Sequence, residues 1–230
     1  MTELFLPVLN DTALLTEPIA QPRSAPVATQ PIRTDAWSKR VFDIVVAGVV
    51  ALTVLIWLLP IIGLAVRLTS PGPALFVQLR TGRHGRLFRC LKFRTMTYDR
   101  HATFKQATKN DSRITPLGRF LRKTNLDELP QVLNVLTGDM SIVGPRPHPI
   151  QLDAQHWKTM PGYPARYAVR PGITGLAQVR GCRGETKTLR EMHHRVRYDH
   201  LYIRKQSLVL DLRICLWTVL KMIQGDDKAC

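Results

Sequence analysis

The sequence predicts a mixed α/β fold in which a membrane-associated helix precedes a compact domain. Residues 44–66 form an apolar run without a charged side chain, and residues 74–96 hold two alternating stretches separated by TGRHG. Residues 115–137 carry apolar side chains at helical spacing. At 230 residues the chain accommodates one domain with appendages. We therefore divide it into a disordered leader over residues 1–36, a membrane-associated helix over residues 37–69 and a compact domain over residues 70–230.

The leader is rich in proline, alanine and threonine and shows no sustained period. Such a composition supplies too little apolar surface for a packed core. The apolar run at residues 4–8 is too short for a signal peptide, has no basic residue before it and is followed by Asp11 and Glu17. Nothing in this stretch predicts secretion.

The apolar run at residues 44–66 is 23 residues long, which is enough to span a bilayer. Lys39 and Arg40 precede the run and Arg67 follows it, so a spanning orientation would put cations on both sides and violate the positive-inside bias. Pro60 lies in the second half of the run and, without an N–H group, bends a helix. We infer a re-entrant helical hairpin that breaks at Pro60, with a simple transmembrane anchor as the alternative.

The stretch after the turn at residues 70–73 predicts a small β-hairpin, with its strands in ALFVQLR and RLFRCLKFRTM. Alternation in the second strand places Arg86, Lys92 and Arg94 on one side. Two interpretations of that side are open: a solvated strand face, or a cationic wall that faces phosphate groups.

Two adjacent carboxylates, Asp127 and Glu128, stand at the start of an apolar helical pattern. Pro130 fits only near the first turn of a helix, so the pair lies at or just before the helix N-terminus. This placement has an ordinary explanation, because the helix dipole favours acidic residues there and Asn125 with Glu128 resembles a capping box.

Cations on both sides of the pair offer a second explanation. Arg122 and Lys123 precede it and Arg146 follows it. A carboxylate kept ionised by such neighbours can be a nucleophile toward phosphorus, and a carboxylate pair can hold Mg²⁺ through one or two oxygens. The planar fork of arginine suits substrate phosphates. The sequence therefore leaves a helix cap and an anion-handling site as the two interpretations.

The net charge of +16 is unevenly placed, since residues 37–230 carry 31 basic against 13 acidic side chains. Such a balance implies an anionic partner, either nucleic acid or an anionic membrane surface with phosphate-bearing substrates. The four cysteines are far apart, which indicates a reducing compartment and no zinc site. No G-x-G-x-x-G follows a strand, so a Rossmann domain is not expected.

The C-terminal third holds a glycine-bearing loop and two helical patterns. Arg170 opens the loop RPGITG, whose N–H groups suit a phosphate or nucleotide, with an ordinary turn as the alternative. Residues 188–205 and 207–223 predict two helices. Charges within the second, such as Asp211, argue against a span and favour a helix that lies in the membrane interface or covers the core.

Four ordered blocks of this chain resemble the bacterial sugar transferase family, the monotopic phosphoglycosyl transferases that start assembly of surface glycans on a polyprenyl phosphate. The blocks are KRVFDIVVA, TSPGPALFVQLRTGRHGRLFRCLKFRTM, RITPLGRFLRKTNLDELPQVLNVLTGDMSIVGPRP and VRPGITGLAQVRG. The resemblance runs from Lys39 to the C-terminus and leaves only the leader outside it.

The resemblance implies a two-step exchange at the cytoplasmic face of the bacterial inner membrane. Residues 70–230 would form the catalytic domain, with amphipathic helices in the interface. The carboxylate of Asp127 would attack the sugar-linked phosphate of a UDP-sugar and release UMP, and undecaprenyl phosphate would then take the phosphosugar. The resemblance also implies Mg²⁺ at Asp127 and Glu128.

Further site residues follow from the resemblance. Residues that position the dyad and grip phosphate or nucleotide map onto Arg122, Arg146, Lys92, Arg94 and Arg170, and the break of the re-entrant helix maps onto Pro60. The chain departs from the family pattern at Leu59, where several members have Ser, and at Lys205-Gln206, where an Asn-Trp pair is common.

The segment RGETKTLREMHHRVRYDHLYIR is most similar to the branch that transfers glucose 1-phosphate in exopolysaccharide synthesis, which implies UDP-glucose as the donor. A homodimer is left open, and nucleic acid is not expected as a partner. Two alternatives are kept: a membrane-tethered nucleic-acid-binding protein, because of the charge, and a scaffold of a polysaccharide export complex in which the dyad only caps a helix.

Overall fold

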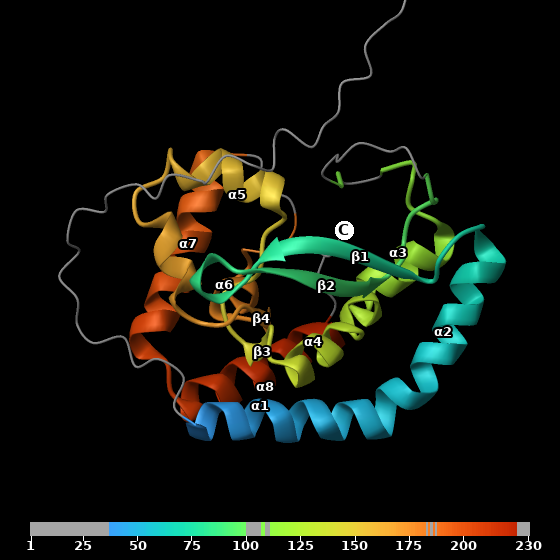
Figure 1. The fold of residues 1–230 in the computed structure, drawn as a ribbon, viewed down its shortest axis with the longest axis horizontal. Coiled ribbons are helices and arrows are strands. Elements are labelled where there is room, and N and C mark those ends of the chain that lie inside the picture. Colours follow the sequence, from blue (N-terminus) through green and yellow to red (C-terminus); the bar gives the residue numbers. More distant parts are fainter. Residues whose placement is uncertain are drawn as a thin grey trace, which may run out of the picture. The chain divides into compact units, whose positions relative to one another are not determined.

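The computed structural model describes residues 37–99, 107–108, 111–182, 184, 186 and 188–224. The leader predicted for residues 1–36 lies outside these residues. Helices make up most of the described chain, and its strands form two small sheets (Figure 1). The predicted mixed α/β class is confirmed.

The membrane-associated segment is helical from Trp37 to Thr69, and among the described residues it is the one helix that is long and apolar enough to cross a membrane. It consists of α1 (Trp37–Val50), a π-helical turn (Ala51–Leu55) and α2 (Ile56–Thr69). The chain changes direction between α1 and α2 (Figure 1).

Pro60 lies inside α2, so the chain stays helical at the position where the sequence predicted a break. A proline removes the N–H that the carbonyl four residues earlier would bind and crowds that carbonyl, so the distortion falls on the turns before it. The π-helical turn lies there, and the N–H of Ile56 reaches the carbonyl of Ala51, five residues back. The π-helical turn therefore ends more than one helical turn before Pro60.

The predicted β-hairpin is confirmed. Strands β1 (Leu75–Thr81) and β2 (Leu87–Phe93) pair antiparallel and are joined by a short 3₁₀ turn. The register pairs Phe76 with Lys92 and Arg80 with Phe88. Because side chains of directly paired residues point to the same face, Arg80 and Lys92 lie on one face of the hairpin.

A second sheet pairs β3 (Ser141–Val143) with β4 (Gly172–Thr174) in parallel, and it is largely buried. The two strands approach closely where they meet: a Cβ on Gly172 would lie 2.0 Å from the backbone nitrogen of Gly144. Around the two sheets lie α3 (Pro116–Lys123), α4 (Gln131–Thr137), α5 (Ile150–Trp157), α6 (Leu176–Val179), α7 (Leu189–Lys205) and α8 (Leu208–Gln224).

The last helix, α8, packs one face against the second sheet and exposes the other. It contacts β3, β4 and α6, with Asp211 and Ile214 fully buried. The core-covering interpretation of this segment is therefore confirmed. Its exposed face is mostly apolar, with Arg213 among the exposed side chains of Leu208, Val209, Leu212, Leu216, Val219 and Leu220.

A buried ionic cluster joins the start of the membrane-associated helix to the rest of the protein. Lys39 Nζ lies 2.9 Å from Asp43 Oδ1 and 3.2 Å from Asp211 Oδ2 on α8. The same Asp43 oxygen accepts a hydrogen bond from the Ser141 hydroxyl of β3 at 2.9 Å. All four side chains are buried. The cluster therefore fixes α1 against both α8 and β3.

Replacing Asp43 by alanine leaves the buried ammonium of Lys39 with one carboxylate and removes the oxygen that accepts from the Ser141 hydroxyl and from the Ile142 N–H. Loss of one partner from a buried ion pair costs about 3–5 kcal/mol. We expect the free energy of unfolding in detergent micelles, measured by denaturant titration, to fall by about that amount. Asp139→Ala is the control, because its carboxylate accepts an exposed hydrogen bond from Thr137. Equal losses for the two variants would contradict the structural role of the cluster.

Candidate functional site

The predicted dyad lies on a short 3₁₀ turn (Leu126–Glu128) between α3 and α4. Asn125 adopts a left-handed conformation with φ of 57°, which asparagine tolerates, and turns the chain out of α3. Pro130 immediately precedes α4, so the prediction that the pair stands just before a helix N-terminus is confirmed. The Asn125 side chain makes no capping hydrogen bond, so the capping-box interpretation is wrong.

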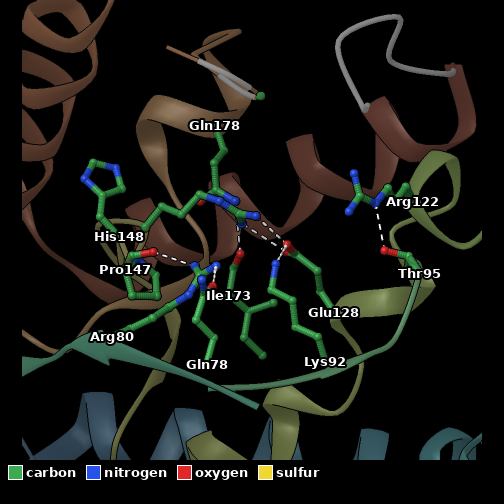
Figure 2. A network of polar contacts seen from close by, with 12 residues as sticks. Gln78, Arg80, Lys92, Thr95, Arg122, Glu128, Pro147, His148, Ile173 and Gln178 are labelled. Atoms are coloured by element: carbon green, nitrogen blue, oxygen red, sulfur yellow. Dashed lines mark hydrogen bonds and ion pairs between the residues drawn. The ribbon is translucent and has the colours of Figure 1, made fainter. Parts of the chain in front are cut away.

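Both oxygens of Glu128 are bound to cations, as Figure 2 shows for Lys92. Lys92 Nζ donates to Oε1 at 2.6 Å, and the Arg146 guanidinium donates to Oε2 at 3.0 Å and also to Oε1. Burial alone would raise the pKa of Glu128, but Arg146 and Lys92 hold it well below its usual value. Glu128 is therefore an ionised anchor for a cation from β2 and a cation from the loop after β3.

The carboxylate of Asp127 differs from that of Glu128 in its contacts and in the direction of its pKa shift. It is 9% exposed, and among the described residues none forms a hydrogen bond or ion pair with it. Burial and the charge of Glu128 raise its pKa to about 6, against the opposing effects of Lys92, Arg122 and Arg146. At neutral pH Asp127 is therefore a buried, ionised carboxylate that has no hydrogen-bond or ion-pair partner among the described residues.

Arg122 approaches the dyad from the last turn of α3. Its Nε donates to the Thr95 hydroxyl at 2.9 Å (Figure 2), and its charge lowers the pKa of Asp127. The helix is set directly against Thr95, since a Cβ on Gly118 would lie 2.0 Å from the Thr95 carbonyl oxygen. The prediction that Arg122 belongs with the dyad agrees with this geometry.

Two other predicted phosphate-binding cations are paired with helix ends. The buried guanidinium of Arg94 donates to the carbonyl oxygens of Pro71 and Ser70, just after α2. Arg170 Nε donates at 2.8 Å to the carbonyl of Gly138, which follows α4, whereas the dyad precedes α4. Carbonyls at helix C-termini lack helical partners and attract basic side chains. The structure therefore places these two arginines as helix-end partners.

The sequence interpretation missed two arginines that hold the loop of Arg146. Arg80 donates to the carbonyl of Pro147 at 2.6 Å (Figure 2), and Arg166 donates to the carbonyl of Arg146 at 2.6 Å. Arg166 is itself paired with Asp199 at 2.7 Å. Both arginines are buried. Their hydrogen-bond partners lie 67 and 20 residues away in the sequence, so no local sequence pattern identifies these two arginines as site residues. Strand alternation, which puts Arg80 on the same face as Lys92, was the one available indication.

His148 lies among these arginines as a neutral group. Its Nδ1 is 2.6 Å from the Tyr163 hydroxyl and 2.9 Å from Arg166 Nη1. Burial, and then the charges of Arg166 and Arg195, hold its pKa well below the usual value. A neutral imidazole can accept a hydrogen bond from arginine without adding charge to a crowded cationic region.

The dyad fits Mg²⁺ through one carboxylate. Mg²⁺ is usually bound by one or two carboxylates together with substrate phosphates and waters. Asp127 offers oxygens that no side chain in the described part of the chain binds, whereas both oxygens of Glu128 accept from cations. Within the described chain, no three His, Cys, Asp or Glu side chains gather into a protein-only metal site. A shared site would therefore consist of Asp127 and substrate oxygens.

Comparison with known proteins decides the family. The family model described as Bacterial sugar transferase matches residues 34–225, which is most of the chain. The chain belongs to this family. The resemblance seen in the four sequence blocks is thereby confirmed.

Curated relatives of this sugar transferase are close in sequence. The UDP-glucose:undecaprenyl-phosphate glucose-1-phosphate transferase of Klebsiella pneumoniae is 50% identical over 184 residues, covering 80% of this chain and 39% of that protein. The protein of the same name from Caulobacter vibrioides is 49% identical over 191 residues, covering 82% and 71%. The exopolysaccharide production protein PSS of Rhizobium leguminosarum is 45% identical over 186 residues, covering 79% and 92%.

These relatives differ in length and in the sugar that their names specify. The chain spans about two fifths of the length of the first curated relatives that it matches. Relatives named for other sugars are less similar: an N-acetylgalactosaminephosphotransferase of Aeromonas hydrophila is 38% identical, and a galactose phosphotransferase of Salmonella typhimurium is 37% identical.

Asp127→Asn should stabilise the sugar transferase at neutral pH. The folded pKa of about 6 exceeds the ordinary value of 3.8, so the native carboxyl binds its proton more tightly than the unfolded one. Ionisation then costs stability as the pH rises from about 4 to about 6, by about 3 kcal/mol in total. The neutral amide removes this cost. Melting temperature, measured in detergent without divalent cations, should therefore rise at pH 7.5 and match the wild type at pH 4.

Asp139→Asn is the control for this measurement and should melt like the wild type at both pH values. If Asp127→Asn melts below the wild type at pH 7.5, the ionised carboxylate is stabilised by its surroundings and the account of the dyad is wrong.

Proposed function

We propose that this protein transfers a sugar 1-phosphate from a UDP-sugar to undecaprenyl phosphate, releases UMP and so initiates synthesis of a surface glycan. One observation carries the proposal: Glu128 is bound by Lys92 and Arg146, while the adjacent, equally buried Asp127 is ionised and has no partner among the described residues. The names of the relatives, which specify undecaprenyl phosphate, support the choice of acceptor.

The proposed reaction has two displacements at one phosphorus atom. In the first, an oxygen of the Asp127 carboxylate attacks the phosphorus that carries the sugar. The Asp127 O–P bond forms as the P–O bond to the uridine phosphate breaks, and the electron pair leaves with UMP. In the second, a phosphate oxygen of the lipid attacks the same phosphorus and the carboxylate leaves. The product is an undecaprenyl diphosphate sugar.

The cations around the dyad suit this chemistry. Phosphoryl transfer asks a protein mainly for in-line positioning and for stabilisation of charge on the transferred group. Arg146 and Lys92 are fixed by Glu128, and Arg122 adds a third positive charge from α3. The carboxylate of Glu128 therefore contributes by holding cations at the site while Asp127 reacts.

Mg²⁺ is the proposed cofactor, held by Asp127 together with oxygens of the donor diphosphate. When bound, Mg²⁺ supplies positive charge that offsets the negative charge of the diphosphate. The role that we assign to Glu128 is indirect, because its two oxygens are occupied by Lys92 and Arg146.

The membrane-associated helix is proposed to be re-entrant at the cytoplasmic face of the inner membrane. A spanning helix would place its ends on opposite faces of the bilayer. Here Lys39 and Arg40, at the start of the helix, bind Asp211 and the carbonyl of Val135, and Arg94 binds the carbonyls after its end. Both ends are therefore held by residues 70–230, which supports a monotopic arrangement with the dyad near lipid-phosphate depth.

Glucose is the proposed sugar and UDP-glucose the proposed donor. Relatives whose names specify glucose are 43% to 51% identical to this chain, whereas those named for N-acetylgalactosamine and galactose are 38% and 37% identical. The similarity to a protein named for exopolysaccharide production favours an exopolysaccharide as the glycan.

The test is UMP release by the purified full chain with UDP-glucose, undecaprenyl phosphate and Mg²⁺. We expect steady release that chelation by EDTA stops, and faster release from UDP-glucose than from UDP-galactose or UDP-N-acetylgalactosamine. Asp127→Asn should lower the rate by at least about 10³-fold, because it removes the nucleophile.

Asp139→Asn, a carboxylate substitution outside the dyad, should keep the wild-type rate of UMP release. Full turnover by Asp127→Asn would contradict the nucleophile assignment. Absence of UMP release from the wild type with every UDP-sugar would contradict the proposed reaction.

A further inference from the structure

We propose that Asn134 is a positioning residue that holds β2, and through it Lys92, against the dyad. Asn134 lies on α4 and is 4% exposed, and its side chain forms hydrogen bonds with β2. Its side-chain Nδ2 donates to the carbonyl of Arg89 at 2.8 Å, and its Oδ1 accepts from the N–H of Leu91 at 3.0 Å. Both donor and acceptor functions of the amide are therefore used on one strand.

The two contacts complete an open sheet edge. β2 belongs to a two-stranded sheet and pairs with β1, and no other strand of the described residues lies along its second edge. Arg89 and Leu91 are two residues apart, so their backbone groups point to the same edge. A side-chain amide offers the same donor and acceptor as a peptide group. The side-chain amide of Asn134 therefore binds the open edge of β2 as a peptide group of a neighbouring strand would. It thereby fixes the position of β2 along α4.

This attachment bears directly on Lys92, which is the residue after Leu91. Lys92 reaches Glu128 Oε1 at 2.6 Å, and Glu128, at the end of the 3₁₀ turn, precedes Asn134 of α4 by six residues. The strand is thus joined to the dyad segment at two points, one ionic and one through neutral hydrogen bonds. Without the hydrogen bonds of Asn134, the polar link between β2 and the dyad segment is the ion pair of Lys92, at the end of a flexible side chain, beside the apolar cluster that holds Phe93 with Leu126 and Leu129.

The backbone of Asn134 has a separate task that its side chain does not share. Its carbonyl accepts the N–H groups of Asp139 and Met140, which closes the turn between α4 and β3. A substitution of the side chain leaves these backbone bonds in place. Variants at this position therefore report on the strand edge rather than on the turn.

The consequence for catalysis rests on the proposed function, but the structural claim can be tested without it. In Asn134→Ala we expect Lys92, whose side chain is 15% exposed in the ion pair, to react severalfold faster with a water-soluble amine-acylating reagent. Labelling is quantified by mass spectrometry of peptides, with exposed Lys158 as the internal reference. Asn134→Ser, which keeps one hydrogen-bonding group, should lie between the wild type and the alanine variant.

A matched control loses a hydrogen bond of similar kind elsewhere. The hydroxyls of Thr174 and Thr218 lie 2.6 Å apart between β4 and α8, away from β2. Thr218→Val should leave the labelling of Lys92 at the wild-type rate even if it lowers the melting temperature. Equal labelling of Lys92 in wild type, Asn134→Ala and Asn134→Ser would overturn the proposal.

A double-mutant cycle tests the link to the reaction. We expect Asn134→Ala to slow UMP release about 10- to 100-fold, as for a misplaced catalytic group. The double variant Asn134→Ala with Lys92→Met should release UMP little more slowly than Lys92→Met alone, because both substitutions remove the contribution of a positioned Lys92 ammonium. Losses that multiply would show that Asn134 does not act through Lys92. If the wild type releases no UMP, the proposed function fails, and the labelling result still decides the role of Asn134.

Discussion

The ion triad of Glu128, Lys92 and Arg146 is the interaction on which the site depends. It brings together three segments that are far apart in the sequence: β2, the turn before α4 and the loop after β3. Two adjacent carboxylates in a buried place would repel each other, and the triad places both cations in direct contact with Glu128, while Asp127 is affected by them only through space. Asp127 keeps a raised pKa and a carboxylate that no residue within the described ranges binds. The fold, rather than the residue types, therefore divides the pair into an anchor and the proposed nucleophile.

A second set of contacts connects this site to the membrane-associated helix. The start of α1 is held by the buried cluster of Lys39, Asp43 and Asp211, and the end of α2 is held by Arg94. Arg94 is two residues beyond Lys92, so the end of the helix and the dyad are both attached to the β2 segment. The position of the membrane-associated helix is therefore coupled to that of the dyad through the β-hairpin. A lipid-linked acceptor requires this coupling, because its phosphate remains at the membrane surface.

Elements with a local signal were predictable from the sequence. Alternation identified the hairpin, and Pro130 identified the helix start after the dyad. The bend was located at Pro60, but a proline distorts the turns before it, and the irregular turn lies at Ala51–Leu55. Arginine roles depended on tertiary contacts: Arg94 and Arg170 were assigned to phosphate and bind helix-end carbonyls, while Arg80 and Arg166, which hold the loop of Arg146, were missed.

The most direct measurement is the mass of the protein after incubation with the sugar donor alone. The full chain is mixed with UDP-glucose and Mg²⁺ without lipid acceptor, quenched in acid and digested for mass spectrometry. The account predicts a hexose phosphate on the peptide that contains Asp127, located at that residue and lost when undecaprenyl phosphate is added before the quench. Formation of the lipid-linked product at the normal rate, with no adduct at Asp127 at any time, would contradict it.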